Sequence, residues 1–364
     1  MRDQPSIVVD ARMIASSGIG TCLRNALPRI VRQRPNWRFT ILGNRQRLAD
    51  LELSENAEIR DADAPVYSVR EQLDFARFDL RRADLFWSPH YNIPIAPTRR
   101  LVVTVHDIMH LTLPEYRSRW LRRQYATTMY TAVRRRASAV ICDSAFTRRE
   151  FERVVGTGPA THVIHNGVHA SWFGIPDDVK AASTRPYVVF VGLAKPHKNL
   201  VGLLQAFALI RDRVPHDLVV VGSRRDGLRT IDQRIDAAAA PLNGRVRFTE
   251  HLDFATLQQC VARADVLVQP SFYEGFGLPP LEAMAAGTPC LASRIDPLVE
   301  VCGDAACYCD PADPSDIARR LLELLENPEA RRQLGSRGRE RARAFSWDRS
   351  AAETLAVFEQ VLSS

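Results

Sequence analysis

Lysine is almost missing from this sequence of 364 residues, which contains three lysines against 46 arginines. Two of the three, Lys195 and Lys198, stand in one short segment, GLAKPHKN. Lysine presents a compact point charge, whereas arginine presents a planar fork of donors. The use of lysine at this place indicates a steric requirement in the segment.

Long apolar runs are also lacking. No stretch reaches the roughly 18 apolar residues that a membrane-spanning helix needs. The opening residues, MRDQPSIVVDARMI, carry charges and lack the apolar core of a signal peptide. We therefore expect a cytoplasmic protein, or one docked peripherally on the inner face of the cell membrane.

The seven cysteines are scattered, which argues against a disulfide framework. The one cluster is Cys302, Cys307 and Cys309. A zinc site would need a fourth ligand and usually a CxxC pair, and neither is near in the sequence. We interpret these residues as buried strand cysteines.

Positive charge is concentrated in the first half of the chain. Residues 1–170 hold 26 arginines and 17 acidic residues, whereas the remainder holds 23 basic and 25 acidic residues. The stretch from Arg117 to Arg136 contains seven arginines and no acid, interleaved with Trp120, Tyr125 and Tyr130. It can lie against anionic lipid or a phosphorylated acceptor, or it is a solvated helix face. Nucleic acid is a weaker alternative, because no nucleic-acid-binding motif accompanies the charge.

Short apolar strands alternate with amphipathic helical segments along the whole chain. This pattern predicts parallel sheets covered by helices on both faces, an α/β class. The series restarts at YVVFV after a loose stretch, so we predict two doubly wound domains at residues 1–170 and 187–345. Residues 171–186 form the predicted linker, and residues 346–364 a final helix. Ligands of such sheets bind beyond the carboxyl ends of the strands, which predicts a site in a cleft between the domains.

The most informative segment is EGFGLPPLE, which runs from Glu274 to Glu282 directly after an apolar strand. Gly275 and Gly277 allow close approach of the backbone to a ligand, and the start of the following helix suits a pyrophosphate. We expect Glu282, in the first helical turn, to accept hydrogen bonds from ribose hydroxyls. Glu274 would orient sugar hydroxyls. The alternative is a plain turn with Glu282 supporting the helix start.

Other candidate residues follow strands or open helices. Gly192 and Gly222 each end a predicted strand and are expected at the donor site. Gly18 and Gly20 open an early helix and could face phosphate or acceptor. The turn after LVVTV contains His106 and Asp107, and the later turn contains His165 and Asn166; for these four residues a local structural role stays open.

These segments resemble family 4 glycosyltransferases, and more narrowly bacterial mannosyl- and rhamnosyltransferases of surface-polysaccharide synthesis. The resemblance rests on the two glutamates around GFG followed by LEAMAAGTPC, and on VFVGLAKPHKNL, VIHNGV, ICDSAFTRREF and GIGTCLRNAL. It covers nearly the whole chain. It implies the two-domain GT-B fold, retention of anomeric configuration, and a final helix that returns to the first domain.

Site residues carried over from this resemblance agree with the pattern. Glu274 would contact the transferred sugar, and His106 would hydrogen-bond it near the anomeric centre. Lys198 would bind the diphosphate. The backbone of Phe276, Gly277 and Leu278 would donate to sugar and phosphate. The position after Gly192 is Leu193 where the family usually has arginine, so Lys195 or His197 would supply the second charge.

We therefore predict a hexosyltransferase that moves mannose or a deoxyhexose from a GDP-sugar to a lipid-linked or cell-surface glycan, with no cofactor and no metal. The one DxD match, Asp61–Ala62–Asp63, lies in a polar stretch and is discounted. A UDP-hexose donor is the alternative within the same class. A nucleotide-sugar epimerase and a degenerate carbohydrate-binding protein are alternatives from other classes.

Overall fold

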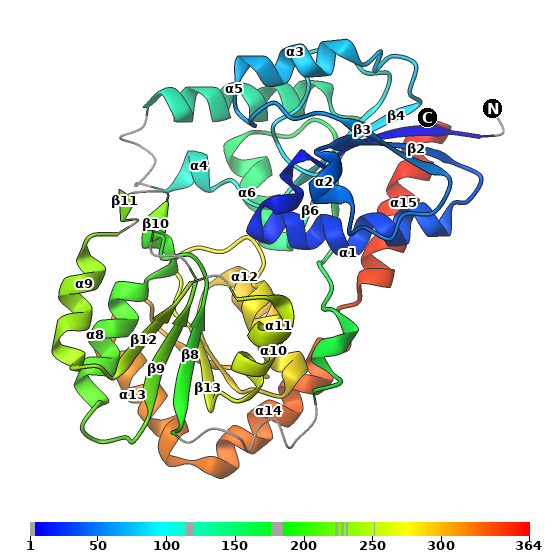
Figure 1. Cartoon of the computed structure of the whole chain (residues 1–364). Coiled ribbons are helices and arrows are strands. Elements are labelled where there is room, and N and C mark those ends of the chain that lie inside the picture. The colour runs from blue at the N-terminus through cyan, green and yellow to red at the C-terminus, as the bar shows by residue number, and fades with distance from the viewer. Residues whose placement is uncertain are drawn as a thin grey trace. The chain divides into compact units, whose positions relative to one another are not determined.

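The structure is a computed structural model, and it describes residues 4–113, 120–175, 185–222, 225–226, 229–230, 232–250 and 252–364. The chain divides into two compact units (Figure 1). Unit 1 comprises Met1–Gly167 and Ser346–Ser364, and unit 2 comprises Val168–Phe345. Each unit is a parallel sheet flanked by helices.

The sheet of unit 1 contains seven strands in the order β3-β2-β1-β4-β5-β6-β7 across its described residues. The strands are β1 (Ser6–Asp10), β2 (Arg38–Gly43), β3 (Ala57–Asp61), β4 (Leu85–Ser88), β5 (Leu101–Val105), β6 (Ala139–Cys142) and β7 (Ala160–Val163). All pairings are parallel. The strands β4, β5 and β6 are buried throughout, as strands covered on both faces must be.

Helices flank this sheet, and most are amphipathic. They are α1 (Ser17–Gln33), α2 (Arg45–Leu48), α3 (Val69–Arg77), α4 (Met109–Thr112), α5 (Trp120–Arg136), α6 (Ala145–Val154) and α15 (Trp347–Ser363), with a 3-10 turn η1 (Arg12–Ala15) after β1. The helix α15 packs in unit 1 beside α1, where Arg29 pairs with Asp348 at 3.0 Å. The ring centroid of Phe358 lies 5.5 Å from that of Trp87, which belongs to β4. The packing of α15 therefore completes the core of unit 1.

The main sheet of unit 2 contains six strands in the order β12-β9-β8-β13-β14-β15 within the described part. They are β8 (Tyr187–Val191), β9 (Asp217–Val221), β12 (Val246–Thr249), β13 (Val266–Gln269), β14 (Cys290–Ser293) and β15 (Cys307–Cys309). A short antiparallel pair, β10 (Arg225–Asp226) and β11 (Arg229–Thr230), lies apart from it. In both units the strand order reverses beside the first strand, which is the arrangement of a dinucleotide-binding fold.

The helices of unit 2 are α8 (Leu200–Ile210), α9 (Arg234–Ala239), α10 (Phe254–Ala262), α11 (Leu278–Ala286), α12 (Asp296–Cys302), α13 (Pro314–Glu326) and α14 (Pro328–Ala342). The 3-10 turns within the described residues of this unit are η3 (Ala170–Trp172), η4 (Pro196–Lys198) and η5 (Ala240–Leu242). One apolar cluster lies on the side of the sheet that α8 and α13 cover, and another lies on the side of α10 and α11. The fold class predicted from the strand–helix alternation is therefore confirmed in both units.

The segment predicted as a linker, residues 171–186, is described at 171–175 and 185–186. Its described start belongs to unit 2, where Trp172 is buried in the core. The chain leaves unit 1 at Gly167 and re-enters it at Ser346. A Cβ atom on Gly167 would stand 2.2 Å from the backbone nitrogen of Trp347. Only glycine therefore allows the segment that leaves unit 1 and the segment that re-enters it to lie this close.

Among the described residues, no helix has both the length and the apolar character needed to cross a membrane.

Candidate active site

The switch point of the unit 2 sheet lies between β8 and β13, which pair in register at Val266 with Val188. Two loops follow the carboxyl ends of these neighbouring strands. The loop after β8 contains Gly192 and the two lysines, and the loop after β13 leads to the GFG turn. Open parallel sheets bind ligands at this place. The sequence-predicted donor residues of these two loops are therefore brought together in one unit.

An ion pair joins the two loops. Lys198 donates from Nζ to Oε2 of Glu274 at 2.6 Å, and only 7% of the Glu274 side chain is exposed. The other carboxylate oxygen, Oε1, accepts from Ser271 Oγ at 2.7 Å and from Gln269 Nε2 at 2.9 Å. Both supporting residues are fully buried. Glu274 is thus fixed from three directions, and its position is set by the end of β13 as much as by the GFG turn.

The turn before α11 offers backbone donors. Gly277 is the N-cap of α11 at φ 122° and ψ 53°, a conformation that favours glycine. Pro279 and Pro280, in the first turn of α11, have no N–H group, so donation falls to the residues before them. In the described part of the chain, the amides of Gly277 and Leu278 have no hydrogen-bond partner. The Phe276 ring packs against that of Phe345 at 6.0 Å, so only its backbone is suited to a ligand.

Glu282 differs in position from the prediction. The helix begins at Leu278, so Glu282 is its fifth residue and stands one turn further in than expected. Prolines at the second and third helical positions explain this early start, because proline is favoured in a first turn. Burial raises the pKa of Glu282 to about 8. Its carboxyl has no hydrogen-bond partner among the residues that the structure describes, which leaves it to accept from or donate to a ligand.

The lysine loop is held in a fixed shape. Asn199 adopts a left-handed conformation at φ 58° and caps α8, and its side-chain amide donates to the carbonyls of Pro270 and Pro311. The carbonyl of His197 accepts from the Phe272 amide at 2.8 Å. These bonds fasten the loop after β8 to the loop after β13.

The candidates for the second phosphate ligand differ in exposure. His197 is only 4% exposed and packs into the loop. Lys195 is half-buried, and its ammonium has no ion-pair partner within the described ranges. Gly192 and Gly222 lie side by side, since a Cβ atom on Gly222 would stand 2.2 Å from the Gly192 carbonyl oxygen. A side chain at Gly222 would push the two strand ends apart.

His106 lies in unit 1, after β5, with both ring nitrogens engaged. Its Nδ1 lies 2.6 Å from Asp143 Oδ2, and its Nε2 lies 2.9 Å from the Pro89 carbonyl oxygen, to which it donates. Asn166 donates to the same Asp143 oxygen at 2.8 Å. Burial alone would lower the pKa of His106, but the attraction of Asp143 and these hydrogen bonds outweigh it and raise that pKa. The His106 ring therefore links β4, β5 and β6 at their carboxyl ends.

The two glycines that open α1 are not equivalent. A Cβ atom on Gly20 would stand 2.3 Å from the Ile14 carbonyl oxygen, so glycine is required there by the packing of α1 on η1. Gly18 is exposed and faces open space. Of the pair, only Gly18 is placed to approach a ligand.

Unit 1 also contains a buried polar network that the sequence patterns missed. Arg12 makes two hydrogen bonds to Asp10, at 2.8 and 2.7 Å, and pairs with Glu71 at 2.7 Å. Glu71 accepts from Asn92 Nδ2 at 2.6 Å, and the Tyr125 hydroxyl donates to Asn92 Oδ1. Burial raises the pKa of Glu71 although Arg12 opposes it. The signal in the sequence was an acid at the end of the first strand, Asp10, with a basic residue, Arg12, two positions later.

No group of three or more potential metal ligands occurs in the part of the chain that the structure describes. The carboxylates of the DxD match have protein partners: Asp61 accepts from the Arg45 amide at 3.1 Å, and Asp63 accepts from Asn44 at 2.8 Å.

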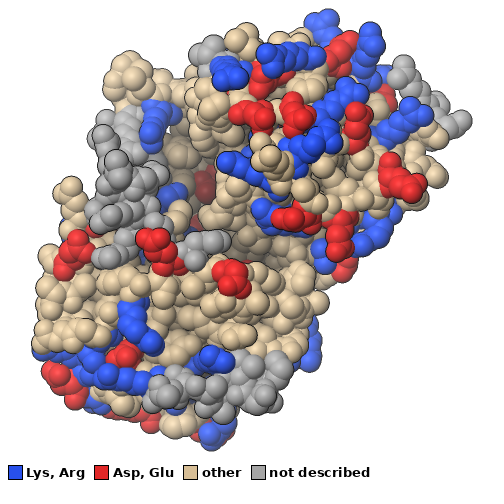
Figure 2. Space-filling view, in the orientation of Figure 1, with Lys and Arg blue, Asp and Glu red and all other residues tan. Residues whose placement is uncertain are grey.

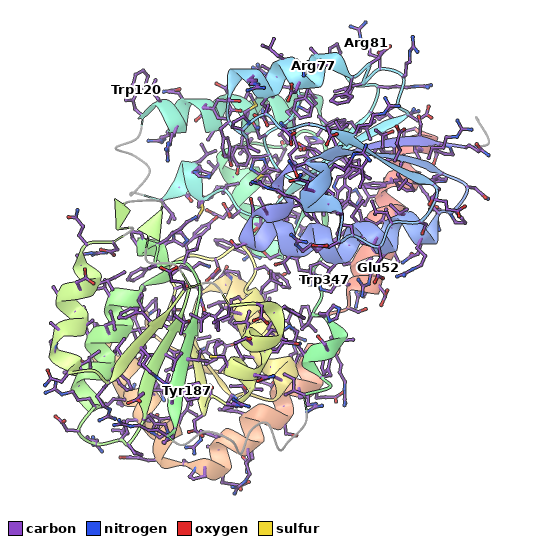
Figure 3. The ribbon with its side chains drawn as sticks, in the orientation of Figure 1. Glu52, Arg77, Arg81, Trp120, Tyr187 and Trp347 are labelled. Atoms are coloured by element: carbon purple, nitrogen blue, oxygen red, sulfur yellow. The ribbon has the colours of Figure 1, made fainter. Side chains whose placement is uncertain are left out.

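The basic stretch is helical from Trp120 onward, and residues 114–119 lie outside the described residues. Trp120 and Leu121 are 64% and 66% exposed, and Arg122 and Arg123 beside them are exposed as well. Trp120 stands at the start of α5 and points away from the domain (Figure 3). On the face shown in Figure 2, basic side chains are frequent on unit 1 and alternate with acidic ones.

Two family models match the chain. The model described as Glycosyl transferases group 1 matches residues 175–341, and the model described as Glycosyltransferase Family 4 matches residues 37–172. Together the two matches span most of both units.

Three curated relatives have the word mannosyltransferase in their names. The chain is 29% identical to O-antigen chain mannosyltransferase B of Escherichia coli over 76% of this chain and 74% of that protein. It is 34% identical to MMP alpha-(1->4)-mannosyltransferase of Mycolicibacterium hassiacum, over 56% of this chain and 49% of that one. For O-antigen chain mannosyltransferase RfbU of Salmonella typhimurium the identity is 27%, over 68% and 66%. The matches thus span about half to three quarters of the length of these relatives.

Solved structures agree in fold. Sucrose-phosphate synthase from Thermosynechococcus elongatus superposes with a TM-score of 0.83 at 22% identity, covering 99% of both chains. The Anabaena protein Alr3699/HepE in complex with UDP-glucose gives a TM-score of 0.78 at 19% identity, over 97% and 99%. With its two Rossmann-like units, its motif-bearing loops at the switch point and both family models matched, the chain belongs to the family 4 glycosyltransferases, enzymes of the GT-B fold.

Proposed function

We propose that this glycosyltransferase moves mannose, or a related deoxyhexose, from a GDP-sugar to a lipid-linked or cell-surface glycan without a metal ion. The observation that carries the proposal is the Lys198–Glu274 pair beside the open amides of Gly277 and Leu278. A cation and free N–H groups suit a diphosphate, and the fixed carboxylate suits sugar hydroxyls. The names of the three mannosyltransferase relatives support the choice of sugar and acceptor.

The leaving group is stabilised by the residues around it. Breaking the sugar–phosphate bond places negative charge on the departing diphosphate. Lys198, Lys195 and the start of α11 would neutralise that charge as fixed groups in a partly dry site, where such groups are most effective. Of the two second-charge candidates, the exposure of Lys195 favours it over the buried His197. Glu282 would accept from the ribose.

The proposed reaction retains the anomeric configuration. Glu274 is clamped by Ser271, Gln269 and Lys198, which suits a hydrogen-bond acceptor for sugar hydroxyls better than a mobile nucleophile. We favour attack by the acceptor on the face from which the phosphate leaves, with the phosphate taking the acceptor's proton. His106 would act here by positioning, since its two ring nitrogens hold Asp143 and the Pro89 carbonyl.

The acceptor is proposed to bind unit 1, and anionic lipid to contact its basic helix α5. The exposed Trp120 and Leu121 beside Arg122 and Arg123 combine apolar and cationic groups, as interfacial helices do. A lipid-linked acceptor would then be presented at the same surface.

A UDP-hexose donor is the second candidate, supported by the fold likeness to Alr3699/HepE, whose structure is described as a complex with UDP-glucose. A binding protein with a degenerate site is less well supported, because Lys198, Glu274 and Glu282 are all present. An epimerase is less well supported because it binds no acceptor and would have no use for the basic stretch from Arg117 to Arg136.

Nucleotide binding tests the proposal. Thermal unfolding is followed with GDP, UDP, dTDP and ADP, each with and without EDTA. GDP is expected to raise the melting temperature most, by the same amount in EDTA. A larger shift with UDP would favour the second candidate, and loss of the shift in EDTA would contradict metal independence. If no nucleotide shifts the melting temperature, the proposal that the donor is a nucleotide sugar is contradicted.

A further inference from the structure

An aromatic cluster lies in unit 1 next to the His106 linkage and is used by none of the roles above. Tyr67 precedes α3, whereas His90 and Tyr91 directly follow β4. The ring of Tyr67 lies 5.5 Å from His90, 6.1 Å from Tyr91 and 5.9 Å from Tyr125 of α5. The cluster is connected to His106 through the turn that starts at Pro89. It therefore stands at the ligand-binding edge of the unit 1 sheet.

Tyr67 has an unfavourable backbone. Its φ is 67°, and the other described non-glycine residues with positive φ, Asn199 and Asn243, are of a type that tolerates this region. This region is sterically unfavourable for a tyrosine, because the Cβ atom comes too close to the following carbonyl oxygen. Such outliers persist where the surroundings hold them, and they concentrate at functional sites.

Two contacts hold this conformation. The Tyr67 amide donates to Glu71 Oε2 at 2.9 Å, and Glu71 is itself held by Arg12 and Asn92. The Tyr67 hydroxyl lies 2.9 Å from His90 Nε2. His90 Nδ1 accepts from the Asn92 amide at 3.1 Å, so the neutral ring carries its hydrogen on Nε2 and donates it to the Tyr67 oxygen. The buried network thus fixes both the backbone amide and the hydroxyl group of Tyr67.

The fixed tyrosine is not a core residue, since it is 46% exposed. The Tyr67 oxygen accepts from His90 Nε2 and from the Tyr91 hydroxyl, which leaves the O–H of Tyr67 itself to donate. Desolvation raises the pKa of Tyr67, so the hydroxyl keeps its proton at neutral pH. A tyrosine combines an apolar ring face with a polar tip. A pyranose presents the matching pair, a face of C–H groups and an edge of hydroxyls.

We infer that Tyr67 is a binding residue for the acceptor, and that it takes a pyranose ring whose hydroxyl accepts from the Tyr67 hydroxyl. This inference rests on the proposed function for the identity of the ligand as an acceptor. The donor residues Lys198, Glu274 and Glu282 all belong to unit 2. Loss of Tyr67 is therefore expected to leave the binding of the nucleotide unchanged.

The test compares three variants of the full chain. Tyr67→Phe removes the hydroxyl and keeps the ring, and Tyr67→Asn removes the ring while relieving the left-handed backbone. Tyr130→Phe is the matched control. It removes a hydroxyl that donates to the Asp107 carbonyl at 2.7 Å, from a fully buried ring whose centroid lies 4.4 Å from that of Tyr91. The acceptor probes are octyl glycosides of mannose, rhamnose, glucose and galactose.

Ligand-observed NMR measures binding of the octyl glycosides without any donor, and a transfer assay with GDP-mannose and UDP-glucose measures the acceptor KM. We expect the wild type to bind at least one glycoside, and both Tyr67 variants to bind it at least about tenfold more weakly with the Kd for the nucleotide unchanged. The control should melt at a lower temperature and bind the glycoside normally.

Binding that is the same in the wild type and the Tyr67 variants would overturn the inference, as would a wild type that binds none of the glycosides. A wild type that binds a glycoside through Tyr67 but transfers no sugar from either donor would contradict the proposed function and leave Tyr67 as a glycan-binding residue.

Discussion

Lys198 Nζ and Glu274 Oε2 lie 2.6 Å apart, so the two charged side chains that we propose for binding the diphosphate and the transferred sugar are paired with each other. In the proposed donor complex, the diphosphate would compete with Glu274 for the ammonium of Lys198, while a sugar hydroxyl would donate to the carboxylate of Glu274. Donor binding would then replace one charged contact by two, and a different mutant phenotype is expected for each of the two residues.

The Glu274→Gln variant should fold normally and lose sugar transfer by about 100-fold or more, which corresponds to roughly 2.7 kcal/mol of transition-state stabilisation. The amide keeps the size of the side chain but cannot hold Lys198 and a sugar hydroxyl as a carboxylate does. Initial rates and the melting temperature are measured together. Transfer within threefold of the wild type would remove Glu274 from the site.

The Lys198→Ala variant should weaken nucleoside diphosphate binding by about 10- to 100-fold, because a charge-assisted hydrogen bond contributes about 1.5–3 kcal/mol. Titration calorimetry with GDP measures this. Lys195→Ala is the matched comparison in the same loop, and we expect it to weaken binding by a smaller factor. Equal affinity of Lys198→Ala and the wild type would show that the phosphates bind elsewhere.

Glu282 is predicted to reduce stability at alkaline pH. Its pKa is about 8 in the folded protein and about 4.3 in an unfolded chain, so the folded state holds the proton more tightly. Stability from this group is present below about pH 4 and falls as the pH rises towards 8. The Glu282→Gln variant should therefore gain stability over the wild type progressively from about pH 5 to pH 8, while it binds GDP more weakly.

Denaturant unfolding at several pH values measures the difference between the Glu282→Gln variant and the wild type. A difference that stays constant from pH 5 to pH 9 would contradict the raised pKa. Unchanged affinity for GDP would instead contradict the contact with ribose.

His106 gives a second pH dependence, in unit 1. Its pKa is raised in the folded protein by Asp143, with Asp107 adding in the same direction. Protonation of His106 therefore stabilises the fold fully below about pH 6.5, and this contribution is lost as the pH rises through the folded pKa. The His106→Gln variant should lack that component. Melting curves between pH 6 and pH 9 compare the two, and parallel profiles would refute the assignment.

Membrane contact by α5 is tested with vesicles of phosphatidylcholine, with and without phosphatidylglycerol. The Arg122→Ala, Arg123→Ala double variant should lose roughly 2 kcal/mol of binding to the anionic vesicles, since each arginine near such a surface contributes about 1 kcal/mol. The control pair is Arg319→Ala, Arg320→Ala on α13 of unit 2, where acidic neighbours already pair with both arginines. Equal binding of both double variants would contradict the role of α5.

The sequence predicted the fold and indicated the two loops of the proposed donor site, because both depend on short-range patterns. Short runs of apolar residues indicate buried parallel strands, and the glycines and glutamates around the GFG turn lie close together in the chain. Ser144 at the start of α6 is a further local feature, since a serine at this position commonly caps a helix and here accepts from the Thr147 amide. Such features need no knowledge of the tertiary structure.

What the sequence did not predict depends on distant contacts. Strand β3 is an exposed edge strand whose sequence, AEIRD, has no apolar run, and α3 is short. The ion pair between Arg12 and Glu71 joins two residues that lie far apart in the chain, and no sequence pattern indicates that they pair. Gln269 and Ser271 stand in or directly after β13, but their bonds to Glu274 appear only when the loop is folded.

The most direct test of the central claim is a transfer assay with GDP-mannose, octyl α-mannopyranoside and EDTA, with the product analysed by NMR. The account predicts a new α-linked mannoside from the wild type and none from Glu274→Gln. A product formed only when a divalent metal is supplied, a β-linked product, or equal transfer by Glu274→Gln would contradict it.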